Sequence, residues 1–110
     1  MLISDYNKAG HETLIMALFR AIYPDWDEGL LEMMAYDENA PRHVKTKVAL
    51  EQDMLIGQAN VFWIDREKRI ANLGYHVHPA HHRKGVGYQL AMALIDELDG
   101  EVGHLSLIHI

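Results

Sequence analysis

The sequence predicts one α/β domain over residues 1–110, with its elements in the order β-α-α-β-β-β-α-β. Three successive patterns in the spacing of apolar residues predict it. Apolar residues recur every three to four positions in the first part of the chain, as on one face of a helix. They alternate with polar residues between Val44 and Val77, and the helical spacing returns from Val86.

The N-terminal part is expected to form a short strand followed by two helices. Residues 2–3 open the strand, and Asp5 or Asn7 offers a side-chain oxygen to cap the first helix. The apolar stripe of this helix consists of Leu14, Ile15, Leu18, Phe19 and Ile22. Pro24 ends it, and Asp27 caps a second helix. The stripe of the second helix consists of Leu30, Leu31, Met33, Met34 and Tyr36.

Three strands are expected after a loop at residues 37–42. Alternation predicts them at Val44–Leu50, Leu55–Ile64 and Ala71–Val77, and the short turns between them favour an antiparallel meander. Gly57 is expected to mark a bulge or a close approach of two backbones. On the third strand, one face carries Ala71, Leu73, Tyr75 and Val77, and the other carries Asn72, Gly74, His76 and His78.

A last helix and a last strand complete the pattern. The stripe of the helix consists of Val86, Leu90, Ala93, Leu94 and Leu98. Gly100 breaks the helix, and Val102–Ile110 predicts a final strand. The last five residues, SLIHI, fit a strand and also resemble a translated sequencing adapter, so both origins stay open.

Composition excludes several functional classes. The net charge of −6 argues against a protein that coats nucleic acid or an anionic membrane, and no membrane partner is expected. The absence of cysteine excludes disulfides, thiolate metal sites and cysteine nucleophiles. No leader segment is recognisable, and we expect a cytoplasmic protein. Eight acidic residues lie within residues 1–42, either as solvated helix faces or as a rim that attracts a cationic substrate.

The segment from Tyr75 to Tyr88 carries the chemistry. A strand, a proline and a turn with Gly85 open a helix there. The N-terminus of a helix presents unpaired amides and a partial positive charge, and glycine lets an anion come close. Arg83 and Lys84 add positive charge. The pattern predicts a phosphate-binding cradle, although a glycine that only permits tight helix packing would leave the same signature.

Residues 82–87, His-Arg-Lys-Gly-Val-Gly, resemble the Q/R-x-x-G-x-G/A acetyl-CoA signature of the GNAT N-acetyltransferase family. The order of elements is also similar to that of the family. The resemblance implies an acyl-CoA N-acyltransferase (GNAT) fold with a mixed central sheet. It also implies a chain that lacks the family's last helix and two strands. His82 departs from the family pattern, which prefers Gln or Arg at this position.

The resemblance implies transfer of an acetyl group from acetyl-CoA to a primary amine by direct attack. The amine would belong to a small molecule or a peptide. The pantetheine arm would pair with the backbone at His76–His78, where two strands splay apart, and an N–H near Val77 would polarise the thioester. The implied CoA-binding residues are Val77, His82, Arg83, Lys84, Gly85, Val86, Gly87 and Tyr88.

The catalytic base is less clearly marked. Some family members place a glutamate near the positions of Ala71 and Asn72, and neither is a carboxylate here. His76 is the best local substitute, because an unperturbed imidazole has a pKa of about 6.5. Tyr75, His78 or a water relay are alternatives. A domain that binds CoA without turnover is therefore a second hypothesis.

A histidine-based metal-binding module is the third hypothesis. His76, His78, His81 and His82 fall within seven positions, and two of them alternate on a strand. We expect no metal, because no nearby carboxylate completes a set. Asp37 and Glu38 lie near the family's acceptor groove and are either solvated or selective for a cationic amine. An incomplete sheet would expose an edge through which two copies can pair.

Overall fold

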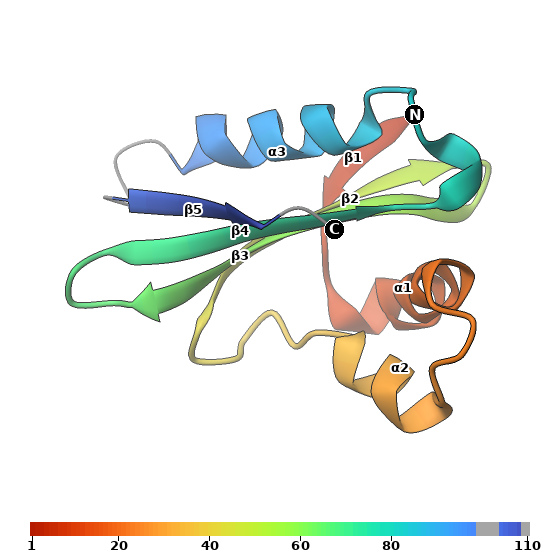
Figure 1. Ribbon diagram of the computed structural model, residues 1–110, viewed down its shortest axis with the longest axis horizontal. Helices are drawn as coiled ribbons and strands as arrows, with labels where there is room; N and C mark the ends of the chain where they lie inside the picture. Colours follow the sequence, from red (N-terminus) through yellow and green to blue (C-terminus); the bar gives the residue numbers. More distant parts are fainter. Residues whose placement is uncertain (99–103, 109–110) are drawn as a thin grey trace.

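The computed structural model describes residues 1–98 and residues 104–108, and of the latter only the backbone is described. The helices and strands form three layers (Figure 1). Figure 1 shows a five-stranded sheet with helix α3 (Val86–Glu97) on one face and helices α1 (Lys8–Ile22) and α2 (Glu28–Met34) on the other. The strands are β1 (Leu2–Asp5), β2 (His43–Glu51), β3 (Met54–Asp65), β4 (Ile70–Val77) and β5 (His104–Ile108). A short 3₁₀ helix, η1 (Pro79–His81), connects β4 to the turn before α3. The predicted order of elements is confirmed.

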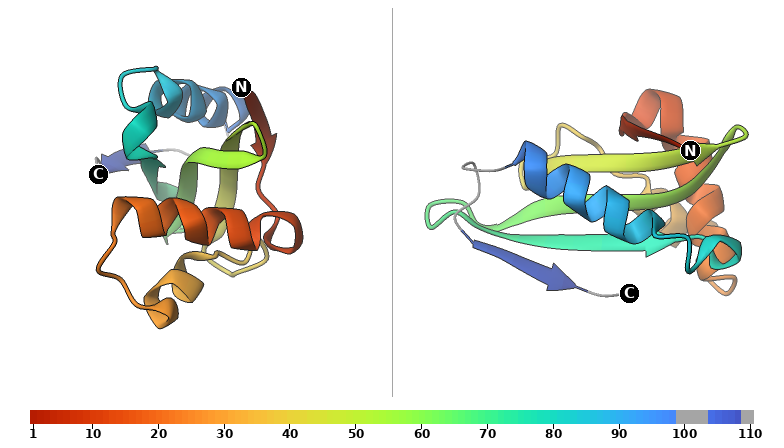
Figure 2. Two further views of the ribbon diagram at one scale, coloured as in Figure 1. Left: turned by 90° about the vertical axis from the view of Figure 1, so that its right-hand side faces the viewer. Right: turned by 90° about the horizontal axis from the view of Figure 1, so that it is seen from above.

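The sheet is mixed, as predicted. Its strands lie in the order β1-β2-β3-β4-β5, and the first four are antiparallel neighbours. Strand β5 runs parallel to β4, with described pairs from Ile70–His104 to Gly74–Ile108. Seen from above in Figure 2, β5 diverges from β4 toward its end at Ile108. The last three residues of β4 therefore lie beyond the described β4–β5 pairing.

The helix boundaries follow the caps that the sequence predicts. Asn7, rather than Asp5, caps α1, and its side chain accepts a hydrogen bond from the amide of Gly10 at 2.6 Å. Asp27 caps α2 by accepting from the amide of Leu30 at 2.9 Å. The inclusion of Tyr36 in the second helix is wrong, because α2 ends at Met34.

Two hydrophobic cores hold the layers together, one on each face of the sheet. Beneath α3, the buried cluster includes Ile56, Val61, Leu73, Leu90 and Leu94. Beneath α1 and α2, it includes Ile15, Leu18, Phe19, Leu31 and Leu55. Odd-numbered residues of β4 face the first core, and His76 faces the helices α1 and α2, as the alternation predicts.

Gly57 is a point of close approach between β3 and α3, as predicted. A Cβ at this position would lie 2.8 Å from Val86 Cγ1 and 3.1 Å from Leu90 Cδ1. The pairing of β2 with β3 also shifts register next to it, between Ala49 and Leu50. The missing side chain therefore lets the N-terminal half of α3 lie directly on the sheet.

Some predictions fall outside the described residues. The prediction that Gly100 breaks the helix falls outside them. The same holds for four residues of the predicted last strand, Val102, Gly103, His109 and Ile110. The described part of that strand is β5. Over the residues that the structure describes, no helix has the length and apolar character needed to cross a membrane.

Candidate functional site

The turn before α3 leaves several backbone amides without partners inside the helix. Gly85 is the N-cap residue, with φ of 74° and ψ of 14°, a left-handed conformation that glycine adopts without strain. No side chain caps this end. The amide of Gln89 donates to the Gly85 carbonyl at 3.0 Å and begins the helical pattern. The amides of Val86, Gly87 and Tyr88 are therefore those that a helix leaves for an external acceptor.

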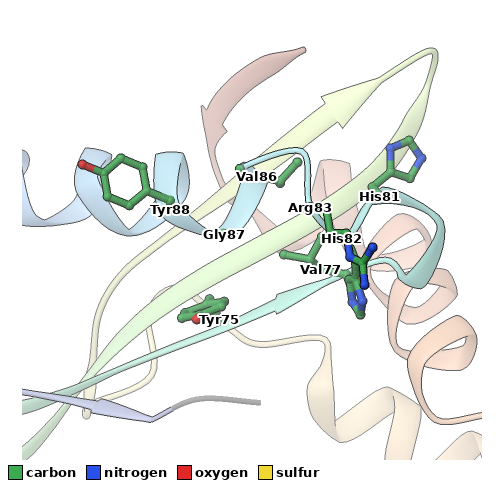
Figure 3. A pocket seen from close by; sticks show the side chains of 9 residues that line it. Tyr75, Val77, His81, His82, Arg83, Val86, Gly87 and Tyr88 are labelled. Carbon is green, nitrogen blue, oxygen red and sulfur yellow. The ribbon is translucent and has the colours of Figure 1, made fainter.

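A cavity of about 300 Å³ opens beside these amides. Figure 3 shows that residues from β4, from the turn and from the first turn of α3 surround it. Seven of the eight predicted CoA-binding residues line it: Val77, His82, Arg83, Gly85, Val86, Gly87 and Tyr88. Lys84 does not; its Nζ lies 3.2 Å from Nδ1 of His81. Tyr75 and His81 also line the cavity and were not predicted, although Tyr75 shares a face with Val77.

Close packing of α3 on β4 shapes the floor of this cavity. A Cβ at Gly87 would lie 3.0 Å from two ring carbons of Tyr75 and 3.4 Å from Val77 Cγ2. The two distances to the Tyr75 ring are shorter than ordinary carbon contacts, so a side chain at position 87 would require the ring to move. Gly87 thus serves the close helix packing that the sequence offered as an alternative, and Gly85 supplies the unusual backbone angle.

The backbone of Val77 points toward the open edge of β4. The amide of the next residue, His78, donates to the carbonyl of Ile56 on β3 at 2.8 Å. Because neighbouring residues of an antiparallel strand point alternately toward and away from the partner, the N–H and C=O of Val77 point away from β3. The ring Nε2 of His82 donates to that carbonyl at 3.1 Å. The N–H of Val77 therefore lies at the edge beyond the described pairing with β5.

Positive charge surrounds the same turn. Arg83 and Lys84 are both exposed, and Arg83 lines the cavity. Arg83 also has φ of 71°, a left-handed value that is uncommon for a residue with a side chain. With the partial positive charge of the α3 N-terminus, these cations make the cavity attractive to an anion such as a phosphate.

A second hollow lies on the opposite face of β4. This acceptor-side groove has a volume of about 360 Å³ and lies between the sheet and the segment that joins α1, α2 and β2. Asn72, Gly74 and His76 of β4 line it, together with residues of β3 and of the helical side. Because residues of β4 alternate between faces, the cavity at Val77 and the groove at His76 adjoin across the edge of one strand.

His76 is buried at the inner end of this groove. Its Nδ1 lies 2.6 Å from Gln58 Nε2, and Gln58 Oε1 accepts from Asn60 at 2.9 Å. The His76 ring packs edge-on against Phe19, with the ring centres 4.8 Å apart. Burial lowers the pKa of His76 to about 4. This pKa lies well below the value of about 6.5 for which His76 was expected to suit a base at neutral pH, and the ring is neutral at pH 7.

The four clustered histidines do not converge on one point. The buried ring of His76 faces α1, whereas His78 Nδ1 accepts from the amide of Ala80 at 3.0 Å. His82 is engaged with the carbonyl of Val77, and His81 lies near Lys84. Among residues 1–98, no three His, Asp or Glu side chains form a group that could hold a metal ion.

The acidic residues of the predicted acceptor region hydrogen-bond to backbone amides. Asp37 accepts from Asn39 at 2.8 Å, and Glu38 accepts from Lys8 at 3.0 Å. The hydrogen bond from the Lys8 amide is the largest cause that lowers the pKa of Glu38. Neither carboxylate is among the residues that line the groove.

Comparisons with known proteins agree with this geometry. The family model for the acetyltransferase (GNAT) family matches residues 12–110. A search of curated proteins found no match. Among solved structures, aminoglycoside N-acetyltransferase AAC(6')-Iy in complex with CoA superposes with a TM-score of 0.72 at 17% identity, over 97% of this chain and 75% of that chain.

Two further structures come from Brucella melitensis. A ribosomal-protein-alanine N-acetyltransferase from biovar Abortus 2308 has a TM-score of 0.73 at 17% identity, over 99% of this chain and 80% of that chain. A GNAT family acetyltransferase in complex with acetyl-CoA has a TM-score of 0.75 at 19% identity, over 96% and 73%. At these identities the superpositions show the fold. With the family match over most of the sequence, they show that the chain belongs to the GNAT family of acetyltransferases.

Proposed function

We propose that the chain transfers an acetyl group from acetyl-CoA to a primary amine by direct attack. The observation that carries this proposal is the cavity at the start of α3. Free helix amides, the left-handed Gly85 and the outward N–H of Val77 lie around one opening. Solved relatives in complex with CoA or acetyl-CoA support the choice of co-substrate.

The turn and the first residues of α3 would hold the pyrophosphate of CoA. The amides of Val86, Gly87 and Tyr88 can donate to its oxygens, and Arg83 adds a positive charge beside them. Glycine at position 85 allows the phosphate to approach the backbone closely. Lys84, which does not line the cavity, would contribute only through its longer-range field.

The edge of β4 would hold the thioester. The pantetheine arm has amide groups and can pair with the outward backbone groups of β4 beyond the described end of the β5 pairing. The N–H of Val77 can donate to the thioester oxygen and stabilise the negative charge that develops there during attack. The side chain of His82 donates to the carbonyl of Val77, in the peptide group that follows this N–H, and helps to hold this end of β4.

The reaction itself needs no covalent enzyme intermediate. The amine nitrogen forms a bond to the carbonyl carbon, the C–S bond breaks, and the proton lost by the amine balances the thiolate that leaves as CoA thiol. The products are an N-acetyl amine and CoA. A chain without cysteine is suited to this direct route, because it has no thiol to acylate.

We propose His76 as the group that accepts the amine proton. It lines the groove on the side of β4 from which an amine can reach the thioester. Its lowered pKa keeps the ring neutral at pH 7, and its lone pair is on Nδ1, which accepts from Gln58, so proton transfer to this weak base requires the Gln58 amide to turn away. A water relay that carries the proton on to solvent would complement this weak basicity.

A domain that binds CoA without turnover is the second candidate. The observation that favours it is the same buried His76, because burial disfavours the imidazolium that a proton transfer would form. This candidate shares the CoA cavity with the first and differs only in the chemistry of the groove.

A thiol-release assay separates the two candidates. Because the chain contains no cysteine, all thiol detected by a colorimetric reagent comes from CoA. Our proposal predicts thiol release that depends on added primary amine. Saturable acetyl-CoA binding with no release above the amine-free rate, across small amines and peptides, would favour the second candidate. Absence of acetyl-CoA binding by the folded chain would overturn both.

A further inference from the structure

The acceptor-side groove is lined mainly by aromatic side chains. Its apolar lining consists of Tyr23, Trp26, Met34, Tyr36 and Phe62. Asn60 and Asn72 contribute the amides, and His76 closes the inner end. No described residue that lines the groove is an aspartate, glutamate, lysine or arginine. An occupant is therefore met by ring faces and amide groups, and by no carboxylate.

Of the acidic side chains nearest along the chain, three accept hydrogen bonds from backbone amides, and Asp25, next to Trp26, is exposed and does not line the groove. Asp27 caps α2, Asp37 closes a turn on Asn39, and Glu38 accepts from Lys8. A substrate with several ammonium groups would lose their hydration without an ion pair inside the groove, and this costs free energy. The groove chemistry thus disfavours a polycationic acceptor.

The aromatic rings form a fixed wall. Tyr23 and Trp26 stack with their ring centres 4.1 Å apart and their planes 10° from parallel. Tyr36 lies in the loop between α2 and β2, and Phe62 lies on β3. The centres of their rings are 5.4 Å apart. Rings in fixed positions bury apolar surface with little loss of conformational freedom, and their faces also attract a single ammonium group.

Gly74 sets where the groove meets the edge of β4. It lies between Tyr75, which lines the CoA cavity, and Leu73 in the core, and it pairs with Ile108 at the last described β4–β5 pair. A Cβ here would lie 3.7 Å from Asn60 Oδ1, an ordinary contact, so the absence of a side chain leaves the groove open. An amine nitrogen near Gly74 would lie next to the strand edge that we assign to the thioester.

From this geometry we infer that the groove binds a primary monoamine on an apolar, aromatic body, of the size of 2-phenylethylamine, as the acetyl acceptor. This inference rests on the proposed function for the acetyl transfer. The binding of such an amine depends only on the groove. The aromatic body would pack against Trp26 and Phe62, and the amine would point toward Gly74 and His76.

Fluorescence of Trp26 tests amine binding directly. Trp63 lies on the other face of the sheet, with the α3 core, so the Trp63→Phe variant leaves Trp26 as the only tryptophan. We expect 2-phenylethylamine to change this fluorescence saturably and to protect it from acrylamide quenching. Kanamycin and spermidine, as polycationic probes, should bind at least tenfold more weakly. Equal or tighter binding of the polycations, or no protection of Trp26 by the aromatic amine, would overturn the inference.

Two substitutions at Gly74 add a matched control. Gly74→Val would place a branched side chain in the groove, and we expect at least a tenfold loss of 2-phenylethylamine affinity. Gly74→Ala has room for its Cβ and should stay within about twofold of the parent. Both variants are checked by circular dichroism. A folded Gly74→Val protein that binds 2-phenylethylamine with unchanged affinity would contradict the assignment of the groove as the amine site. If Gly74→Val does not fold, the protection of Trp26 from quenching in the parent protein decides whether the groove binds the amine.

Calorimetric titration of the same proteins with acetyl-CoA separates this inference from the proposed function. Acetyl-CoA binding with selectivity for polycations would overturn the inference alone. Aromatic-amine binding without acetyl-CoA binding would overturn the proposed function and leave the groove assignment in place. Gly74→Val should bind acetyl-CoA within about threefold of the parent, because residue 74 faces the groove and not the CoA cavity.

Discussion

Nε2 of Gln58 lies 2.6 Å from Nδ1 of His76, between two neighbouring strands of the sheet. The contact is buried and belongs to a short chain of polar groups that continues to Asn60. In this arrangement the Gln58 amide donates and the neutral imidazole accepts at Nδ1. Protonation of His76 would make Nδ1 a donor and force the amide of Gln58 to turn. The pair therefore stabilises the neutral histidine, in the same direction as burial.

The lowered pKa of His76 predicts acid-sensitive stability. In the unfolded chain its pKa is about 6.5, and in the folded chain it is about 4. Between these values the unfolded state binds more protons, so the free energy of unfolding falls as the pH is lowered from 7 to 5. The titration of His76 lowers the free energy of unfolding at pH 5 by about 2 kcal/mol. Urea unfolding at both pH values measures the loss.

The His76→Gln variant isolates the contribution of His76 to this loss of stability at acid pH. His43, whose pKa is also lowered by burial, is unchanged in the variant and continues to lower stability at acid pH. The variant should therefore lose about 2 kcal/mol less than the parent between pH 7 and pH 5. An equal loss in both proteins would show that His76 titrates near its ordinary pKa in the folded state.

Much of the fold could be predicted because local patterns determine it. The period of apolar residues predicted the order of helices and strands, and the cap residues Asn7 and Asp27 were among those the sequence offered. Alternation along β4 predicted that His76 and Val77 face opposite sides of the sheet. These features depend on residues that are neighbours in the chain.

The features that were not predicted depend on packing between distant segments. His76 is buried because Phe19 of α1 packs on the face of the sheet where its ring lies, and no local pattern indicates this contact. Tyr36 falls outside α2 because the helix ends at Met34, although its spacing fits the stripe. Arg83 lines the cavity and Lys84 does not, and no local pattern distinguishes these two adjacent cations.

Gly57→Ala is predicted to destabilise the packing of α3 on the sheet. The added Cβ would lie 2.8 Å from Val86 Cγ1, so the helix must move or side chains must leave their preferred rotamers. We expect a loss of about 1–3 kcal/mol in the free energy of unfolding. Gly74→Ala is the matched control, because its Cβ has ordinary space, and it should change stability by less than about 1 kcal/mol. Comparable urea midpoints for the two variants would contradict the close approach.

Arg83→Ala and Lys84→Ala remove the same charge from adjacent positions. Arg83 lines the cavity that we propose as the CoA site and Lys84 does not, so the first substitution should weaken acetyl-CoA binding about fivefold and the second less than about twofold. Calorimetric titration at low and at high salt measures both. The difference should shrink at high salt, because exposed charges are screened. A larger effect at Lys84 would place the phosphates elsewhere on the turn.

The most direct test of the central claim is calorimetric titration of acetyl-CoA, in EDTA, into the parent chain and two variants at Gly85. Asp and Asn have the same shape and both tolerate the left-handed backbone at this position, so Gly85→Asp and Gly85→Asn differ in charge alone. A carboxylate among the amides that start α3 would repel the pyrophosphate. We predict saturable binding by the parent, a weaker affinity for Gly85→Asn because its side chain hinders close approach of the phosphate, and a further loss of about tenfold or more for Gly85→Asp. Equal affinities for the two variants, or no binding by a parent chain that circular dichroism shows to be folded, would contradict the assignment of this helix start as the CoA site.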